Sequence, residues 1–114
     1  MDVPLILESE YIPEWRRNKE AAEPITVVFQ PLTAGQRTEC INIRTSEHSV
    51  TGGINMPRLV EYGVREIKNL AAGGVAIVTG RQLVSSRGAR LHELVLELAS
   101  EIIIRNQEQD LKNS

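Results

Sequence analysis

The sequence predicts an α+β domain that is predominantly helical, with a small β element of two or three strands near its N-terminus. Three observations support this fold class. A β-branched and aromatic run, Ile25–Phe29, lies between two prolines. Helix-capping residues recur in the middle of the chain. A stripe of leucine and isoleucine residues then extends from about Arg90 to Asp110 at the spacing of a long amphipathic helix.

The N-terminal part, residues 1–32, is expected to be rich in β structure. Residues 3–12 alternate loosely between apolar and polar side chains, and Ile25–Phe29 is the best strand candidate because prolines bound it on both sides. Between these segments, the polar run from Arg16 to Glu23 predicts an exposed loop. Strands this short have open edges, which can pair within the chain or with another chain.

Residues 33–111 are expected to be mainly helical. Thr33 and Gln36 stand three positions apart, so their side chains can satisfy free backbone amides reciprocally in a capping box. This spacing predicts a helix from about Ala34 to Arg44. The following segment, Thr45–Gly53, is rich in serine, threonine and glycine, and this composition favours a flexible loop.

A second helix is expected to begin after Asn55, which is a natural N-cap. Apolar residues at spacings of three and four continue this pattern up to Gly73, where the glycine pair should end the helix. The short apolar run Val75–Val78 suits either a buried strand or an extended connector. A second capping box, formed by Thr79 and Gln82, then predicts a single helical turn.

The last helix, from about Arg90 to Asp110, is the strongest structural prediction. Its apolar stripe consists of Leu91, Leu94, Val95, Leu98 and Ile102. Leu96, Ile103 and Ile104 lie outside this stripe, so the apolar surface of the helix is unusually wide. Either the helix is central and packed on two sides, or these three residues form an exposed patch for a partner or for self-association. Residues 107–114 are polar, and we expect them to fray.

The composition bounds the class of protein. A chain of 114 residues is long enough for one hydrophobic core, so residues 1–114 are expected to form a single domain. Its net charge is −2 and its basic residues are scattered, which argues against nucleic acid as a partner. A single cysteine and the absence of a long apolar run favour a cytoplasmic protein without a membrane partner.

Candidate catalytic and metal-binding residues are few. His48 and His92 are the only histidines, and neither belongs to a group of converging ligands, so no metal site or cofactor is predicted. Cys40 could be an activated nucleophile paired with His48, but its apolar neighbours Ile41 and Ile43 favour burial as a small hydrophobe. No phosphate-binding glycine motif is present. We therefore predict no catalytic residue and no enzymatic activity.

Two segments of the sequence carry a family resemblance. Glu10–Trp15 has the order Tyr-x-Pro-x-Trp, and it precedes a charged loop and the run Ile25–Thr33. Thr79–Val84 contains a Gly-x-x-Leu segment, which precedes the final helical stretch from Leu91 to Ile104. Over about half of its length, the chain resembles the small tail assembly chaperones of long-tailed bacteriophages and prophages.

The resemblance implies a non-enzymatic helper that binds the tape-measure and tail-tube proteins during tail assembly in the bacterial cytoplasm. It implies no catalytic residue, and it fits a wide aliphatic helix face, for which we predict partner binding through Leu96, Ile103 and Ile104. An alternative is a structural phage component, such as a head-to-tail connector or a tail-terminator subunit, that remains in the virion. Homo-oligomerisation is also possible for a chain with open strand edges.

Overall fold

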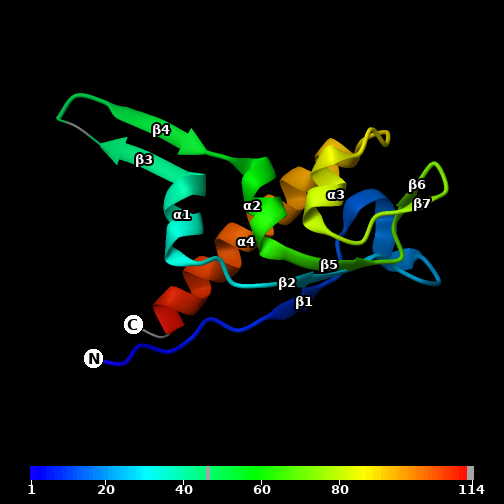
Figure 1. Cartoon of the computed structure of the whole chain (residues 1–114), viewed down its shortest axis with the longest axis horizontal. Coiled ribbons are helices and arrows are strands. Elements are labelled where there is room, and N and C mark those ends of the chain that lie inside the picture. Colours follow the sequence, from blue (N-terminus) through cyan, green and yellow to red (C-terminus); the bar gives the residue numbers. More distant parts are fainter. Residues whose placement is uncertain (46, 113–114) are drawn as a thin grey trace.

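The computed structural model describes residues 1–45 and 47–112. It confirms the α+β class: a small antiparallel sheet lies against helices, of which the C-terminal helix α4 is the longest (Figure 1). The main sheet has three strands in the order β1-β2-β5, formed by Ser9–Tyr11, Thr26–Phe29 and Val64–Lys68. One aliphatic core joins the sheet to the helices.

The central strand of this sheet is β2, the segment predicted from its β-branched residues. It pairs antiparallel with β1 from Ser9↔Phe29 to Tyr11↔Val27, and antiparallel with β5 on its other side. The β2–β5 pairing is irregular between Val28 and Phe29. One residue of β5, Arg65, has no directly opposite partner there, as in a β-bulge.

Both predicted capping boxes are present. Thr33 caps helix α1 (Ala34–Cys40) and Thr79 caps helix α3 (Gly80–Ser85), each with a glutamine side chain returning the bond. Asn55 caps helix α2 (Met56–Gly63) by accepting a hydrogen bond from the Arg58 backbone amide. Helix α3 begins in close contact with α2. A Cβ added at Gly80 would collide with the backbone carbonyl of Val60, so a glycine is needed there.

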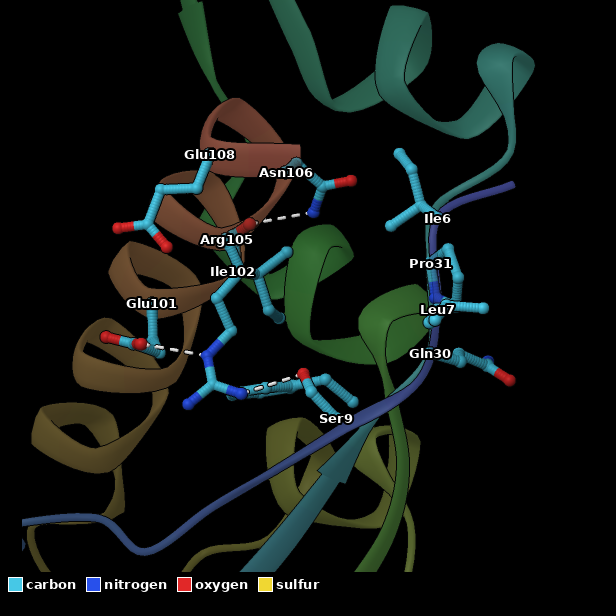
Figure 2. A pocket seen from close by; sticks show the side chains of 11 residues that line it. Ile6, Leu7, Ser9, Gln30, Pro31, Glu101, Ile102, Arg105, Asn106 and Glu108 are labelled. Carbon is cyan, nitrogen blue, oxygen red and sulfur yellow. Dashed lines mark hydrogen bonds and ion pairs between the residues drawn. The ribbon is translucent and has the colours of Figure 1, made fainter. Parts of the chain in front are cut away.

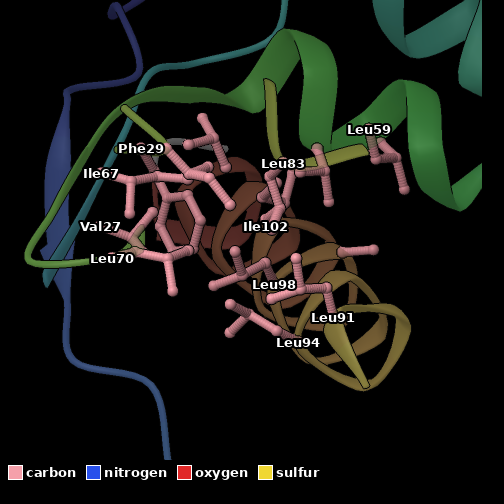
Figure 3. Packing of buried hydrophobic residues seen from close by; sticks show 14 of the residues in the cluster. Val27, Phe29, Leu59, Ile67, Leu70, Leu83, Leu91, Leu94, Leu98 and Ile102 are labelled. Atoms are coloured by element: carbon pink, nitrogen blue, oxygen red, sulfur yellow. The ribbon is translucent and has the colours of Figure 1, made fainter. Parts of the chain in front are cut away.

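Helix α4 (Leu91–Lys112) supplies one side of the core. Leu94 and Leu98 are fully buried, and Figure 3 shows them beside Phe29 and Ile67 from the sheet and Leu83 from α3. The predicted apolar stripe is therefore confirmed as the core-facing side of this helix. The predicted fraying from residue 107 is not what the structure shows, since α4 continues to Lys112; residues 113–114 lie outside the described residues.

A second sheet consists of one hairpin, formed by strands β3 (Ile41–Thr45) and β4 (Val50–Ile54). Its pairing runs from Ile41↔Ile54 to Thr45↔Val50. The hairpin points away from the rest of the chain (Figure 1). A third, very short hairpin, β6 (Ala71–Ala72) with β7 (Val75–Ala76), follows β5.

Several predicted boundaries in the middle of the chain are wrong. The first helix ends at Cys40 instead of Arg44, and the predicted loop Thr45–Gly53 contains most of β4. Residues 33–111 thus hold more β structure than predicted. The predicted loop from Arg16 to Glu23 is exposed except at Asn18, and it overlaps an interrupted 3-10 segment, Trp15–Glu20, in which Arg16 and Arg17 have positive φ angles.

The second helix is also shorter than predicted. It ends at Gly63 and gives way directly to β5, the third strand of the main sheet. Gly73 and Gly74 both have positive φ angles, of 58° and 80°, and they form the turn between β6 and β7. Glycine suits such a hairpin turn because it adopts positive φ without steric cost.

Candidate protein-binding site

The three residues predicted to bind a partner have different environments on α4. The side chains of Leu96 and Ile104 are 51% and 46% exposed, whereas Ile103 is half-buried against the core. With about 100° of rotation per residue, Leu96 and Ile103 lie on nearly the same line of the helix. Ile104 lies about 80° farther around, beyond Leu96 and away from the core. The three side chains therefore do not form one compact patch.

An apolar groove lies beside Leu96. It has a volume of about 370 Å³ and runs between the start of α2, helix α3 and the N-terminal half of α4. Ten residues line it: Met56, Pro57, Leu83, Val84, Ser86, Gly88, Leu91, His92, Val95 and Leu96. Most of the lining is aliphatic, so the groove can accept apolar side chains, and Leu96 extends this surface into solvent.

The part of the groove that α2 and α3 contribute was not predicted from the sequence. Met56 and Val84 are half-buried and pack against the core, while Pro57 is exposed. None of these residues is unusual in sequence, and it is the packing of α2 and α3 against each other and against α4 that brings them together. On α4 itself, His92 lies one helical turn before Leu96. This i, i+4 spacing is the sequence signal that these two residues share one side of the groove.

The opposite side of α4 is tied to the N-terminal segment by polar contacts. The hydroxyl of Tyr11 donates a hydrogen bond of 2.6 Å to Oε2 of Glu97, and the backbone amide of Glu14 donates one of 2.8 Å to the same oxygen. Burial and this bond to a carboxylate raise the pKa of the Tyr11 phenol. Two residues of the Tyr-x-Pro-x-Trp segment, Tyr11 and Trp15, pack against the core.

Arg105 makes a second tie between α4 and the N-terminal segment. Its guanidinium donates to Oε1 of Glu101 at 2.9 Å and to the hydroxyl of Ser9 at 2.7 Å. It also lies 5.2 Å from the ring centroids of both Tyr11 and Phe29, within cation–π range. These contacts hold the C-terminal half of α4 in place, so we assign this side a structural role.

The two candidate catalytic residues, Cys40 and His48, have different environments. Cys40 is buried at the end of α1, and burial raises the pKa of its thiol, which opposes thiolate formation. His48 is exposed in the turn of the β3–β4 hairpin. Among residues 1–45 and 47–112, no group of three or more His, Cys, Asp or Glu side chains is arranged to hold a metal ion.

A second cleft lies at the other end of α4, between residues 6–9, Gln30, Pro31 and the stretch from Glu101 to Glu108 (Figure 2). It is smaller than the groove, at about 250 Å³, and its walls mix apolar and polar side chains. Helix α4 thus borders two hollows of different chemistry.

None of the helices in the described part of the chain is long and apolar enough to cross a membrane. Comparisons with protein-family models, curated proteins and solved structures give no significant match.

Proposed function

We propose that this chain is a non-enzymatic protein-binding helper, a tail assembly chaperone of a long-tailed bacteriophage or prophage. It would bind the tape-measure and tail-tube proteins in the bacterial cytoplasm and leave before the particle is complete. The observation that carries the proposal is the apolar groove beside exposed Leu96. Apart from Met56 and Pro57 of α2, the residues that line this groove lie between Thr79 and Ile104, the part of the sequence that carries the C-terminal half of the resemblance.

The chemistry of the groove suits a helical or extended client with aliphatic side chains. Burying one large aliphatic side chain contributes about 1.5–3 kcal/mol. Micromolar binding requires about 8 kcal/mol, so several side chains must enter the groove or cover Leu96. Binding of this strength is reversible, which a helper needs if it is to release its client.

The contacts of the N-terminal segment complement this assignment. Tyr11 and Trp15 turn towards the core, and Glu97 is occupied by Tyr11 and Glu14. The two segments that carry the resemblance therefore have different roles. The N-terminal segment holds α4 in place, and the α3–α4 part presents the groove. We expect clients to contact Leu96 and the groove, with Ile103 at their margin.

The test is co-expression with the tape-measure protein of the same phage or prophage, followed by quantitative co-purification. Leu96→Glu should reduce recovery of the client at least about tenfold, because a charge cannot enter an apolar contact without losing its hydration. Ile104→Glu is the matched control, since Ile104 is similarly exposed but faces away from the groove. Its recovery of the client should stay near that of the unmodified chain.

Thermal unfolding of both variants accompanies this experiment. Neither should lower the melting temperature by more than a few degrees, because both side chains are already about half exposed. Unchanged client recovery with Leu96→Glu would contradict the proposal. Equal losses of client recovery with both variants would show that the client binds a wider surface that includes Ile104.

The β3–β4 hairpin favours a second candidate function, a structural component retained in the virion. A two-stranded hairpin is marginally stable alone, and this one projects from the body with open edges (Figure 1). A neighbouring subunit of a ring could supply its missing strand. Mass spectrometry of purified virions separates the two functions, because a chaperone should be absent and a connector or terminator subunit present.

A further inference from the structure

The cleft at the C-terminal half of α4 contains a buried polar atom without a partner. Asn106 is only 8% exposed, and its Nδ2 donates a hydrogen bond of 2.7 Å to the backbone carbonyl of Ile102. Its Oδ1 has no hydrogen-bond partner among the described residues. Exchanging the two amide atoms would bring two oxygens together, so the geometry fixes Oδ1 as the free acceptor.

Figure 2 shows that this oxygen points away from α4, into the space towards Ile6. Leaving a buried acceptor unpaired costs about 1–3 kcal/mol. An aliphatic side chain would avoid this cost at the same position. The cleft therefore presents one precisely placed acceptor for a hydrogen-bond donor.

The facing wall of the cleft offers unpaired backbone. Pairing between β1 and β2 stops at Ser9↔Phe29, because the Gln30 amide turns to the carbonyl of Gly63 and Pro31 has no amide hydrogen. Within the described part of the chain, the backbone groups of Ile6 and Leu7 make no hydrogen bond. An extended segment with free backbone groups is a template for an added strand.

We propose that this cleft binds an extended peptide segment of a partner protein. The peptide pairs with the backbone of residues 6–8, places one aliphatic side chain against Phe29, Pro31 and Ile102, and donates a backbone N–H to Oδ1 of Asn106. A volume of about 250 Å³ accommodates one large side chain with its peptide group. It lies below the range of about 300–1,000 Å³ that is usual for drug-sized ligands.

The charges around the cleft favour a neutral or basic peptide. The guanidinium of Arg105 is already engaged by Glu101, Ser9 and the carbonyl of Glu10. The carboxylate of Glu108 also lines the cleft, and Arg105 is the one cation among its described lining residues, so anionic ligands meet repulsion there. This site is separate from the groove beside Leu96, and neither proposal depends on the other.

The test uses the full chain and a blocked, soluble probe peptide, acetyl-Lys-Leu-Thr-Leu-Thr-Lys-amide, in a two-dimensional ¹H–¹⁵N NMR titration. The expected result is saturable shifts of the Asn106 side-chain amide and of the Ile6 and Leu7 backbone amides. The same peptide with both leucines N-methylated loses the leucine N–H groups, which lie on one edge of an extended strand, so it should bind at least about tenfold more weakly when that edge faces the cleft. Equal binding of the two peptides, or no shift with either, would overturn the proposal.

A pair of variants tests the acceptor itself. Asn106→Leu removes the unpaired oxygen but keeps the size of the side chain, so the melting temperature should be unchanged or higher while peptide binding weakens about tenfold. Gln107→Leu is the matched control, because Gln107 is exposed and does not line the cleft. Unchanged peptide binding by Asn106→Leu would refute the site. A lower melting temperature would show that the Asn106 amide serves the fold, and it would also count against the site.

Discussion

The body of the molecule and the β3–β4 hairpin are stabilised in different ways. In the body, strands β2 and β5 place Val27 and Ile67 against Leu94 and Leu98 of α4, and all four side chains are almost fully buried. The hairpin has the same kind of backbone pairing but points away from that core (Figure 1). Its strands chiefly contact each other, with α1 at their base.

This difference separates the part of the chain that holds the fold from the part that is free to change. Burial of apolar area is the largest favourable term in folding, and nearly all of the buried side chains that the structure describes belong to the body. At the base of the hairpin, Ile54 is 37% exposed and Gly52 and Gly53 are exposed. Substitutions should therefore have large effects on stability in the body and small effects in the hairpin.

The largest effect is expected at Leu98, which is fully buried in the middle of α4. Leu98→Ala should lower the free energy of unfolding by about 2–5 kcal/mol, through lost burial and the cavity left behind. Leu96→Ala is the matched control on the same helix, and it should change stability by less than about 1 kcal/mol because Leu96 is 51% exposed. Urea denaturation of both variants measures the contrast.

Equal losses from these two substitutions would contradict the comparison. In that case Leu96 would be buried in solution, and an oligomer interface would be the direct explanation. Analytical ultracentrifugation of the unmodified chain would then reveal the second copy.

The elements best predicted from sequence are those whose signals are local. The final helix follows from its long apolar stripe, and strand β2 follows from β-branched residues between prolines. The helix starts follow from the caps at Thr33, Asn55 and Thr79. Each of these signals lies within a single helix or strand, so no tertiary information is needed.

The errors occur where tertiary pairing overrides a local pattern. Val64 and Ile67 are three residues apart, which reads as one face of a helix. They are in fact both buried in strand β5, because the irregular pairing opposite Val28 and Phe29 gives β5 one extra residue. That extra residue breaks the two-residue period, and only the partner strand reveals it.

The candidate sites were only partly predictable for a similar reason. Leu96 could be singled out because it lies outside the stripe of its own helix. The groove beside it also needs Met56 and Val84, which come from α2 and α3. Likewise, nothing in the sequence near Asn106 indicates that residues 6–9 lie opposite it.

A smaller effect is expected from the polar tie between the N-terminal segment and α4. The pKa of Tyr11 is raised by burial and by its bond to Glu97, so the folded state favours the protonated phenol. The stabilisation that Tyr11 contributes is complete below pH 10.0, the ordinary pKa of a tyrosine phenol, and it is lost as the pH rises further. The free energy of unfolding should therefore fall as the pH rises above 9.0, the ordinary pKa of the Cys40 thiol, and more steeply above 10.0, where Tyr11 and Tyr62 add to the fall because their pKa values are also raised.

Tyr11→Phe isolates this contribution. It should cost about 1 kcal/mol near neutral pH, where the bond to Glu97 is lost, and it should make the alkaline decline shallower. Tyr62→Phe is the comparison: Tyr62 bonds to Glu39 at an exposed site, so its loss near neutral pH should be smaller, although it too makes the alkaline decline shallower. Urea denaturation across this pH range measures both slopes, and identical slopes in Tyr11→Phe and the unmodified chain would refute the assignment.

The smallest effect is expected from removing the hairpin. Ile41 and Ile54 face each other at its base, so replacing residues 42–53 by an Asn-Gly turn joins the strands at a separation that a two-residue turn spans. We expect the free energy of unfolding to change by less than about 1 kcal/mol, because Asn42, Gly52 and Gly53 are exposed and a shorter loop costs less entropy. A loss comparable to that of Leu98→Ala would show that the hairpin completes the core, and the division between body and hairpin would then fail.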